Sequence, residues 1–183
     1  MIILASKSLR RQELLRLVGL DFKIVESNFD ESTIKNVDPQ KIPLLEAENK
    51  AKVVAKDYEN DIVIGADTGV LIENTLLGKP KDKDDAYRML KMLSGKTHKV
   101  ITGVTIISPK KTYKINSISK VTFYDLSDEE IYNYISLEEP YDKAGAYGIQ
   151  GFGATLIKKI DGDYFTIMGL PLAKVYRTLK KII

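Results

Sequence analysis

The sequence of 183 residues contains no cysteine. It therefore has no disulfide framework, no thiolate metal site and no cysteine nucleophile, which suits a reducing compartment, and we expect a soluble, cytoplasmic protein. Neither sign of charge is in large excess, because the chain contains 28 Lys and Arg and 25 Asp and Glu, a net charge of +3. Such a small excess does not indicate a nucleic-acid-binding surface, and no RNA-binding signature stands out. We therefore expect no nucleic-acid partner.

Long apolar runs are missing as well. Only the first five residues are apolar before charges appear, which is shorter than the core of a signal peptide or a membrane span, so we expect no membrane association. We interpret Ile2–Ala5 as a first buried strand. Histidine occurs once, and we expect His98 to make a structural hydrogen bond rather than to act in catalysis. Repeats and low-complexity tracts are absent, so the sequence predicts a single α/β domain over residues 1–183.

The spacing of apolar residues predicts an alternation of strands and helices. Helices are expected at 10–18, 41–58, 82–93, 127–137 and 171–182. Strands are expected at 2–5, 21–26, 62–64, 98–108, 112–124 and 155–160, with a short hairpin at 70–77. The fold class is therefore α/β, with a mixed, elongated sheet flanked by helices. Sheets of this kind bind ligands at the C-terminal ends of strands, where we expect Ser6–Arg11 and Gly65–Thr68 to lie.

The first of these segments, at the junction of a strand and a helix, suits a phosphate group. Arg10 and Arg11 begin a helix although its dipole disfavours cations there. A bound phosphate would use the backbone N–H groups, the hydroxyls of Ser6 and Ser8 and the guanidinium groups together. A solvated basic helix start explains the same residues, so both interpretations stay open.

The second segment places Asp67 directly after an apolar run. A carboxylate there, together with Glu31 as a second acid and Lys50 and Lys79 as cations, is what is needed to hold Mg²⁺ against a polyphosphate. The alternative is that Asp67 caps a turn and that the lysines are surface residues. Strand-end Asp residues are common, so the residues alone favour that alternative.

A glycine-rich stretch, Gly145–Gly153, contains Gln150. Four glycines in nine residues allow the backbone to approach a ligand closely, and the Gln amide offers both a donor and an acceptor, as a uracil edge does. Taken by itself the pattern favours a glycine-rich turn over a base reader.

Taken together and in order, these segments resemble the Maf family of nucleotide pyrophosphatases. The motifs that carry the resemblance are Leu4–Leu15, Gly65–Thr68, Leu77–Pro80, Leu93–His98, Glu139–Gly151 and Gly169–Leu172. The resemblance implies a fold like that of the inosine triphosphate pyrophosphatases, with two lobes and a central cleft. It also implies a divalent metal cofactor, Mg²⁺ or Mn²⁺, and hydrolysis of a nucleoside triphosphate to the monophosphate and pyrophosphate. The sequence leaves a homodimer open.

The resemblance also assigns roles to individual residues. It implies Asp67 as the catalytic proton acceptor, and Arg10, Thr68 and Gln150 match the specificity positions of the subgroup that acts on dTTP and UTP. The charged positions of the family's pocket fall on Glu31, Lys50 and Lys79.

Two residues depart from the usual family pattern. Leu9 replaces a proline, which removes a rigid helix start, and Gly69 replaces a β-branched residue, which we expect to loosen the strand end at Asp67.

The expected chemistry is in-line attack of water on the α-phosphorus. Glu31 and Asp67 hold the metal, and the phosphate chain is bound by Ser6, Ser8, Arg11, Lys50 and Lys79. Two alternatives remain: a nucleotide sensor or cell-division regulator with little turnover, and a phosphatase that releases orthophosphate.

Overall fold

The computed structural model describes all 183 residues, and they form two compact units. The first unit consists of Met1–Asp67, Thr102–Ser117 and Gly169–Ile183, and the second of Thr68–Ile101 and Ile118–Met168. Three long strands contribute to both units. That the chain folds as a single domain stays a prediction.

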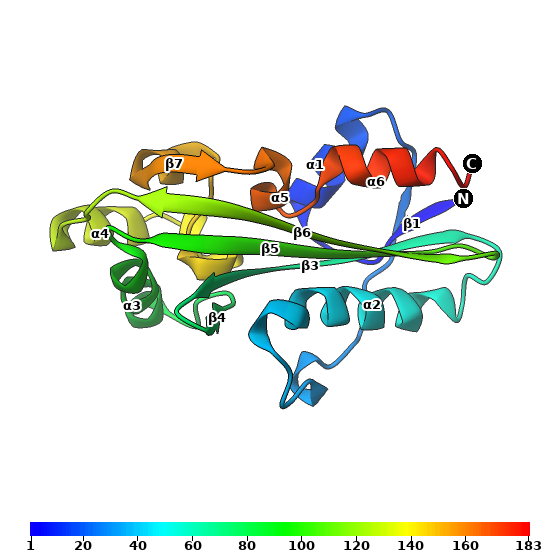
Figure 1. Ribbon diagram of the computed structural model, residues 1–183, viewed down its shortest axis with the longest axis horizontal. Coiled ribbons are helices and arrows are strands. Elements are labelled where there is room, and N and C mark those ends of the chain that lie inside the picture. Colours follow the sequence, from blue (N-terminus) through cyan, green and yellow to red (C-terminus); the bar gives the residue numbers. More distant parts are fainter. The chain divides into compact units, whose positions relative to one another are not determined.

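Seven strands form one mixed sheet in the order β2-β1-β3-β5-β6-β7, and β4 pairs with β3 (Figure 1). The strands are β1 (Ile2–Leu4), β2 (Lys23–Ile24), β3 (Ile62–Ile72), β4 (Thr75–Leu77), β5 (Thr97–Ile107), β6 (Thr112–Phe123) and β7 (Ile157–Asp161). The helices are α1 (Leu9–Leu17), α2 (Ile42–Ala55), α3 (Lys83–Leu93), α4 (Asp128–Ile135), α5 (Tyr164–Met168) and α6 (Leu172–Leu179). The predicted α/β architecture is confirmed, and none of these helices is long and apolar enough to cross a membrane.

In the first unit β1 pairs in parallel with both β2 and β3. Helix α2 packs so closely on the sheet that two strand residues have no room for a side chain. A Cβ on Gly65 would collide with the carbonyl oxygen of Ala47, and a Cβ on Gly103 would collide with the backbone of Leu44. Further along the same helix, Lys50 reaches Asp67 of β3.

The second unit has its own core beneath α3 and α4. Its buried residues come from both helices and from the adjoining strand segments, among them Leu90, Phe123 and Tyr134. A capping box begins α4, because the side chains of Ser127 and Glu130 each bond the other's backbone N–H. The stretch 139–156 is mostly short 3₁₀ turns, so the last strand begins at Ile157 rather than at residue 155.

Candidate active site

Asp67 does not lie at a strand end, contrary to the prediction, but inside the eleven-residue strand β3. The partners of β3 change on either side of it. β1 pairs with β3 up to Ile64, and β4 pairs with it from Val70 onward. Asp67 therefore lies where β1 has already ended. Gly69, expected to loosen this region, is buried inside the strand instead, and a Cβ there would come within 2.6 Å of Leu76 Cδ1.

Lys50 contacts three carboxylates at once. Its Nζ lies 2.7 Å from Asp67 Oδ1 and 2.6 Å from Glu31 Oε1, with Glu46 Oε2 at 3.7 Å. The Lys50 side chain is only 15% exposed and that of Asp67 19%, whereas Glu31 is 54% exposed. Burial opposes the charge on Lys50, but the charge of Asp67 and hydrogen bonds to both acids outweigh burial and raise its pKa. Three residues assigned to the site from sequence thus lie together, and Lys50 is an ammonium ion at neutral pH.

Glu46 is a fourth member of this cluster that the sequence analysis missed. Burial, followed by the negative charge of Asp67 and a hydrogen bond with it, raises the pKa of Glu46 to about 8. Glu46 therefore binds a proton more readily than an ordinary glutamate. Its position one helical turn before Lys50 was a usable signal, because residues i and i+4 share a helix face.

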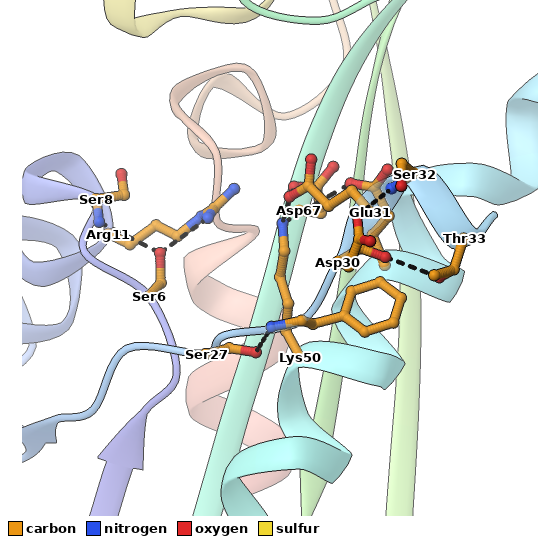
Figure 2. A network of polar contacts seen from close by, with 12 residues as sticks. Ser6, Ser8, Arg11, Ser27, Asp30, Glu31, Ser32, Thr33, Lys50 and Asp67 are labelled. Carbon is orange, nitrogen blue, oxygen red and sulfur yellow. Dashed lines mark hydrogen bonds and ion pairs between the residues drawn. The ribbon is translucent and has the colours of Figure 1, made fainter.

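The cluster fits a divalent cation. Glu31, Glu46 and Asp67 each offer an oxygen, and these oxygens lie within 4.8 Å of one another. Figure 2 shows the side chains of Glu31, Lys50 and Asp67 converging on one place. Carboxylate oxygens are the ligands that Mg²⁺ and Mn²⁺ prefer. The donor set therefore suits the expected metal, and it does not distinguish the two ions.

The loop that carries Glu31 is held by its own backbone contacts. Asp30 Oδ1 accepts the N–H of Ser32 at 3.0 Å, and Thr33 Oγ1 donates to the Asp30 carbonyl at 2.7 Å (Figure 2). These side-chain bonds cap the 3₁₀ turn Glu31–Thr33. The exposed Glu31 is thus presented by an ordered turn within the polar loop that the sequence predicted.

The junction of β1 and α1 is organised around Arg11. Its Nη1 donates to Ser6 Oγ at 3.0 Å, and its Nε donates to the carbonyl of Gly169 at 2.9 Å. Burial lowers the pKa of Arg11, while the charges of Asp67 and Glu31 oppose this effect.

The first turn of α1 suits the binding of an anion. Ser8 occupies the N-cap position and makes no side-chain capping bond, and the first turn contains no acidic residue. The N-terminal N–H groups of α1 therefore retain a partial positive charge without a side-chain cap. The helix begins at Leu9 even though that position lacks the family's proline. Arg10, in the same turn, is partly buried.

Thr68, Lys79 and Gln150 belong to the second unit. Thr68 directly follows Asp67 in β3 and is partly buried, and the side chains of Lys79 and Gln150 are exposed. The N–H of Gly145 donates to the carbonyl of Gly78 at 3.0 Å, so the turn before Lys79 is bonded to the start of the glycine-rich segment.

His98 makes a buried hydrogen bond, as predicted. Its Nε2 lies 2.6 Å from the hydroxyl oxygen of Tyr147, and its ring packs edge-on against Phe123. Burial lowers the pKa of His98 to about 4, so the imidazole is neutral at physiological pH.

The arrangement of the sheet and its helices is shared with a solved protein structure. A solved HAM1 protein from Coxiella burnetii has the same fold, with a TM-score of 0.53 over 98% of each chain at 14% identity. The predicted α/β fold is thereby confirmed as the fold of this HAM1 protein, whereas the cleft between two lobes stays a prediction.

Comparison of sequences identifies the family of the chain. The family model described as Maf-like protein matches residues 1–182, and the chain belongs to the Maf family. A relative from Geobacillus sp. (strain WCH70) is 48% identical over 181 residues, covering 99% of this chain and 97% of its own length. A relative from Thermoanaerobacter sp. (strain X514) is 50% identical over 183 residues, covering 98% and 95%. Both relatives are named dTTP/UTP pyrophosphatase.

Proposed function

We propose that this protein hydrolyses dTTP and UTP to the nucleoside monophosphate and pyrophosphate. The observation that carries the proposal is the cluster of Glu31, Glu46 and Asp67 around the ammonium group of Lys50. It combines oxygen ligands for a cation with positive charge for phosphate oxygens. The names of the two relatives, which align over nearly their whole length, support the choice of substrates.

The proposed reaction is attack of water on the α-phosphorus. The water oxygen forms a bond to the α-phosphorus while the bond from that phosphorus to the bridging oxygen of the β-phosphate breaks, and the electron pair leaves with pyrophosphate. The proton of the water passes to the carboxylate of Asp67, which Lys50 holds at 2.7 Å. Asp67 is therefore the catalytic residue in this proposal.

Glu31, Glu46 and Asp67 would hold the divalent cation, which supplies positive charge to the phosphate oxygens when it is bound. The chain's own residues bind the rest of the anion. The uncapped N-terminus of α1, with Ser6, Ser8 and Arg11, suits one phosphate group. Lys50 and Lys79 would neutralise the others and the charge that develops on the departing pyrophosphate.

In this proposal Arg10, Thr68 and Gln150 select the base of the nucleotide. The side chain of Gln150 is exposed, and its amide matches the donor and acceptor of a uracil edge. The enzyme would then discriminate against other bases because they would leave the hydrogen-bonding groups of the Gln150 amide unpaired.

The experiment that tests this function is a nucleotide panel. The initial rates for dTTP, UTP, CTP, ATP and GTP are measured with Mg²⁺ and with Mn²⁺, and the phosphate products are identified. Preferred turnover of dTTP and UTP with release of pyrophosphate is expected. Preference for a purine triphosphate, release of orthophosphate, or no turnover would each refute the proposal, the last two in favour of a phosphatase and a nucleotide sensor.

A further inference from the structure

The carboxylate of Glu139 accepts three hydrogen bonds. Oε1 accepts the hydroxyl of Tyr134 at 3.0 Å and the N–H of Gly153 at 3.0 Å, and Oε2 accepts the N–H of Phe152 at 3.1 Å. Hydrogen bonds to a charged acceptor are stronger than neutral ones. One side chain thus fixes the end of the glycine-rich segment that contains Gln150.

Tyr134 binds the same segment two residues before Gln150, at Gly148. The N–H of Gly148 donates to the Tyr134 hydroxyl oxygen at 3.1 Å. Tyr134 is fully buried in the core of the second unit, and burial raises its pKa. The hydroxyl therefore stays protonated and donates a hydrogen bond to Glu139. Gly148 and Gly153 are therefore tied to one pair of side chains, with Gln150 between them.

The glycines allow this segment to pack closely against Glu139 and Tyr134. Gly151 has a φ of +66°, and a Cβ there would lie 2.9 Å from Glu139 Oε2. A Cβ on Gly153 would collide with the carbonyl oxygen of Gly148 and approach the Tyr134 hydroxyl to 2.7 Å. The backbone that presents Gln150 is thus held on both sides by close contacts.

We propose that Glu139, together with Tyr134, is a positioning residue that sets the specificity of the enzyme by holding Gln150 in place for the base. This inference rests on the proposed role of Gln150 in reading a uracil-like edge. Gln150 itself is exposed, so its backbone must be held if its amide is to meet a base in a fixed orientation. Glu139 reaches no reacting atom in this proposal and acts only through Gln150.

Glu139→Gln is the informative substitution because it keeps the size of the side chain. An amide has one acceptor oxygen, and its NH₂ group would face N–H donors where a carboxylate oxygen now accepts. Tyr134→Phe is the second variant, since it removes the hydroxyl that both bonds Gly148 and donates to Glu139. Glu138→Gln is the matched control, because Glu138 is exposed and makes no capping bond.

The test is a double-mutant cycle scored by the ratio of kcat/KM for UTP to that for CTP. The ratio is measured for the wild type, Gln150→Ala, Glu139→Gln and the double variant, and for Tyr134→Phe and Glu138→Gln. Thermal melting of each protein separates a change in stability from a change in the ratio. We expect Glu139→Gln and Tyr134→Phe to lower the ratio about tenfold, and Glu138→Gln to leave it unchanged.

The cycle distinguishes positioning from a merely structural role. If Glu139 acts through Gln150, Glu139→Gln changes nothing further in the Gln150→Ala background. A ratio that stays at the wild-type value in both Glu139→Gln and Tyr134→Phe would overturn the inference, as would an equal fall in both backgrounds. If Glu139→Gln does not fold, Tyr134→Phe takes its place in the cycle. A wild-type protein with no preference for UTP would overturn the proposed function as well, so the two failures can be told apart.

Discussion

Lys50 Nζ donates to Asp67 Oδ1 at 2.7 Å, which joins the middle of α2 to the middle of β3. This ion pair is largely shielded from water, and Glu31 and Glu46 extend it to four ionisable groups. Close packing of α2 over Gly65 brings the two chain segments together.

Lys50→Met should destabilise the metal-free protein by about 1–3 kcal/mol, because Asp67 and Glu31 lose the cation that they share. Addition of Mg²⁺ should recover part of that loss. Lys52→Met is the matched control, since Lys52 pairs with Glu48 at 2.7 Å on the exposed side of the same helix and such pairs contribute about 0.3–0.5 kcal/mol. Chemical denaturation in EDTA and in Mg²⁺ measures both variants. Equal stabilities would argue against the shared role of Lys50.

Asp67→Asn should lower kcat more than about 100-fold, because the change keeps the volume but removes the charge that accepts the proton. The fold should be retained, since the neighbouring packing is unaltered. Circular dichroism and steady-state kinetics with UTP check the two parts. Turnover close to that of the wild type would rule out Asp67 as the catalytic residue.

Removal of divalent metal should abolish turnover, since lysines and arginines alone hold a triphosphate poorly. Activity in EDTA and its recovery with Mg²⁺ or Mn²⁺ provide the kinetic measurement. Direct binding of Mn²⁺, followed by electron paramagnetic resonance, should weaken in Glu31→Gln and in Glu46→Gln. Full activity in exhaustively chelated protein would remove the metal from the proposal.

Glu46 should make the metal-free protein less stable as the pH rises. Burial and the charge of Asp67 raise its pKa from 4.5 to about 8. Between these values the folded state binds more protons than the unfolded chain, so stability falls with rising pH by at most about 1.4 kcal/mol per unit. The Glu46→Gln variant has no titrating group at this position. Its free energy of unfolding should therefore rise relative to that of the wild type from about pH 5 to about pH 8. Urea denaturation in EDTA measures this difference, and a difference independent of pH would contradict the assignment.

Much of this fold could be predicted from sequence because apolar periodicity is strong in its long elements. The position of Asp67 could not, because Gly65 and Gly69 beside it are typical of a turn. They are small for another reason, which is that α2 crosses Gly65 and Leu76 covers Gly69. Close packing between segments distant in sequence is invisible to local patterns.

The candidate site, like the fold, could be predicted only in part from the sequence. Glu31, Lys50 and Asp67 could be selected as charged residues of suitable type, and the structure brings them together. Glu46 was missed because a glutamate on a polar helix is usually solvated. Its significance depends on the strand against which α2 packs. The catalytic, metal-binding, phosphate-binding and specificity roles assigned to individual residues, the cytoplasmic location and a homodimer all remain predictions.

The central claim is tested most directly by hydrolysing UTP in water enriched in ¹⁸O and analysing both products by mass spectrometry. Attack on the α-phosphorus predicts one ¹⁸O atom in uridine monophosphate and none in pyrophosphate. Label in pyrophosphate would place the attack on the β-phosphorus, and formation of uridine diphosphate with labelled orthophosphate would place it on the γ-phosphorus. Either result would contradict the reaction proposed for Asp67.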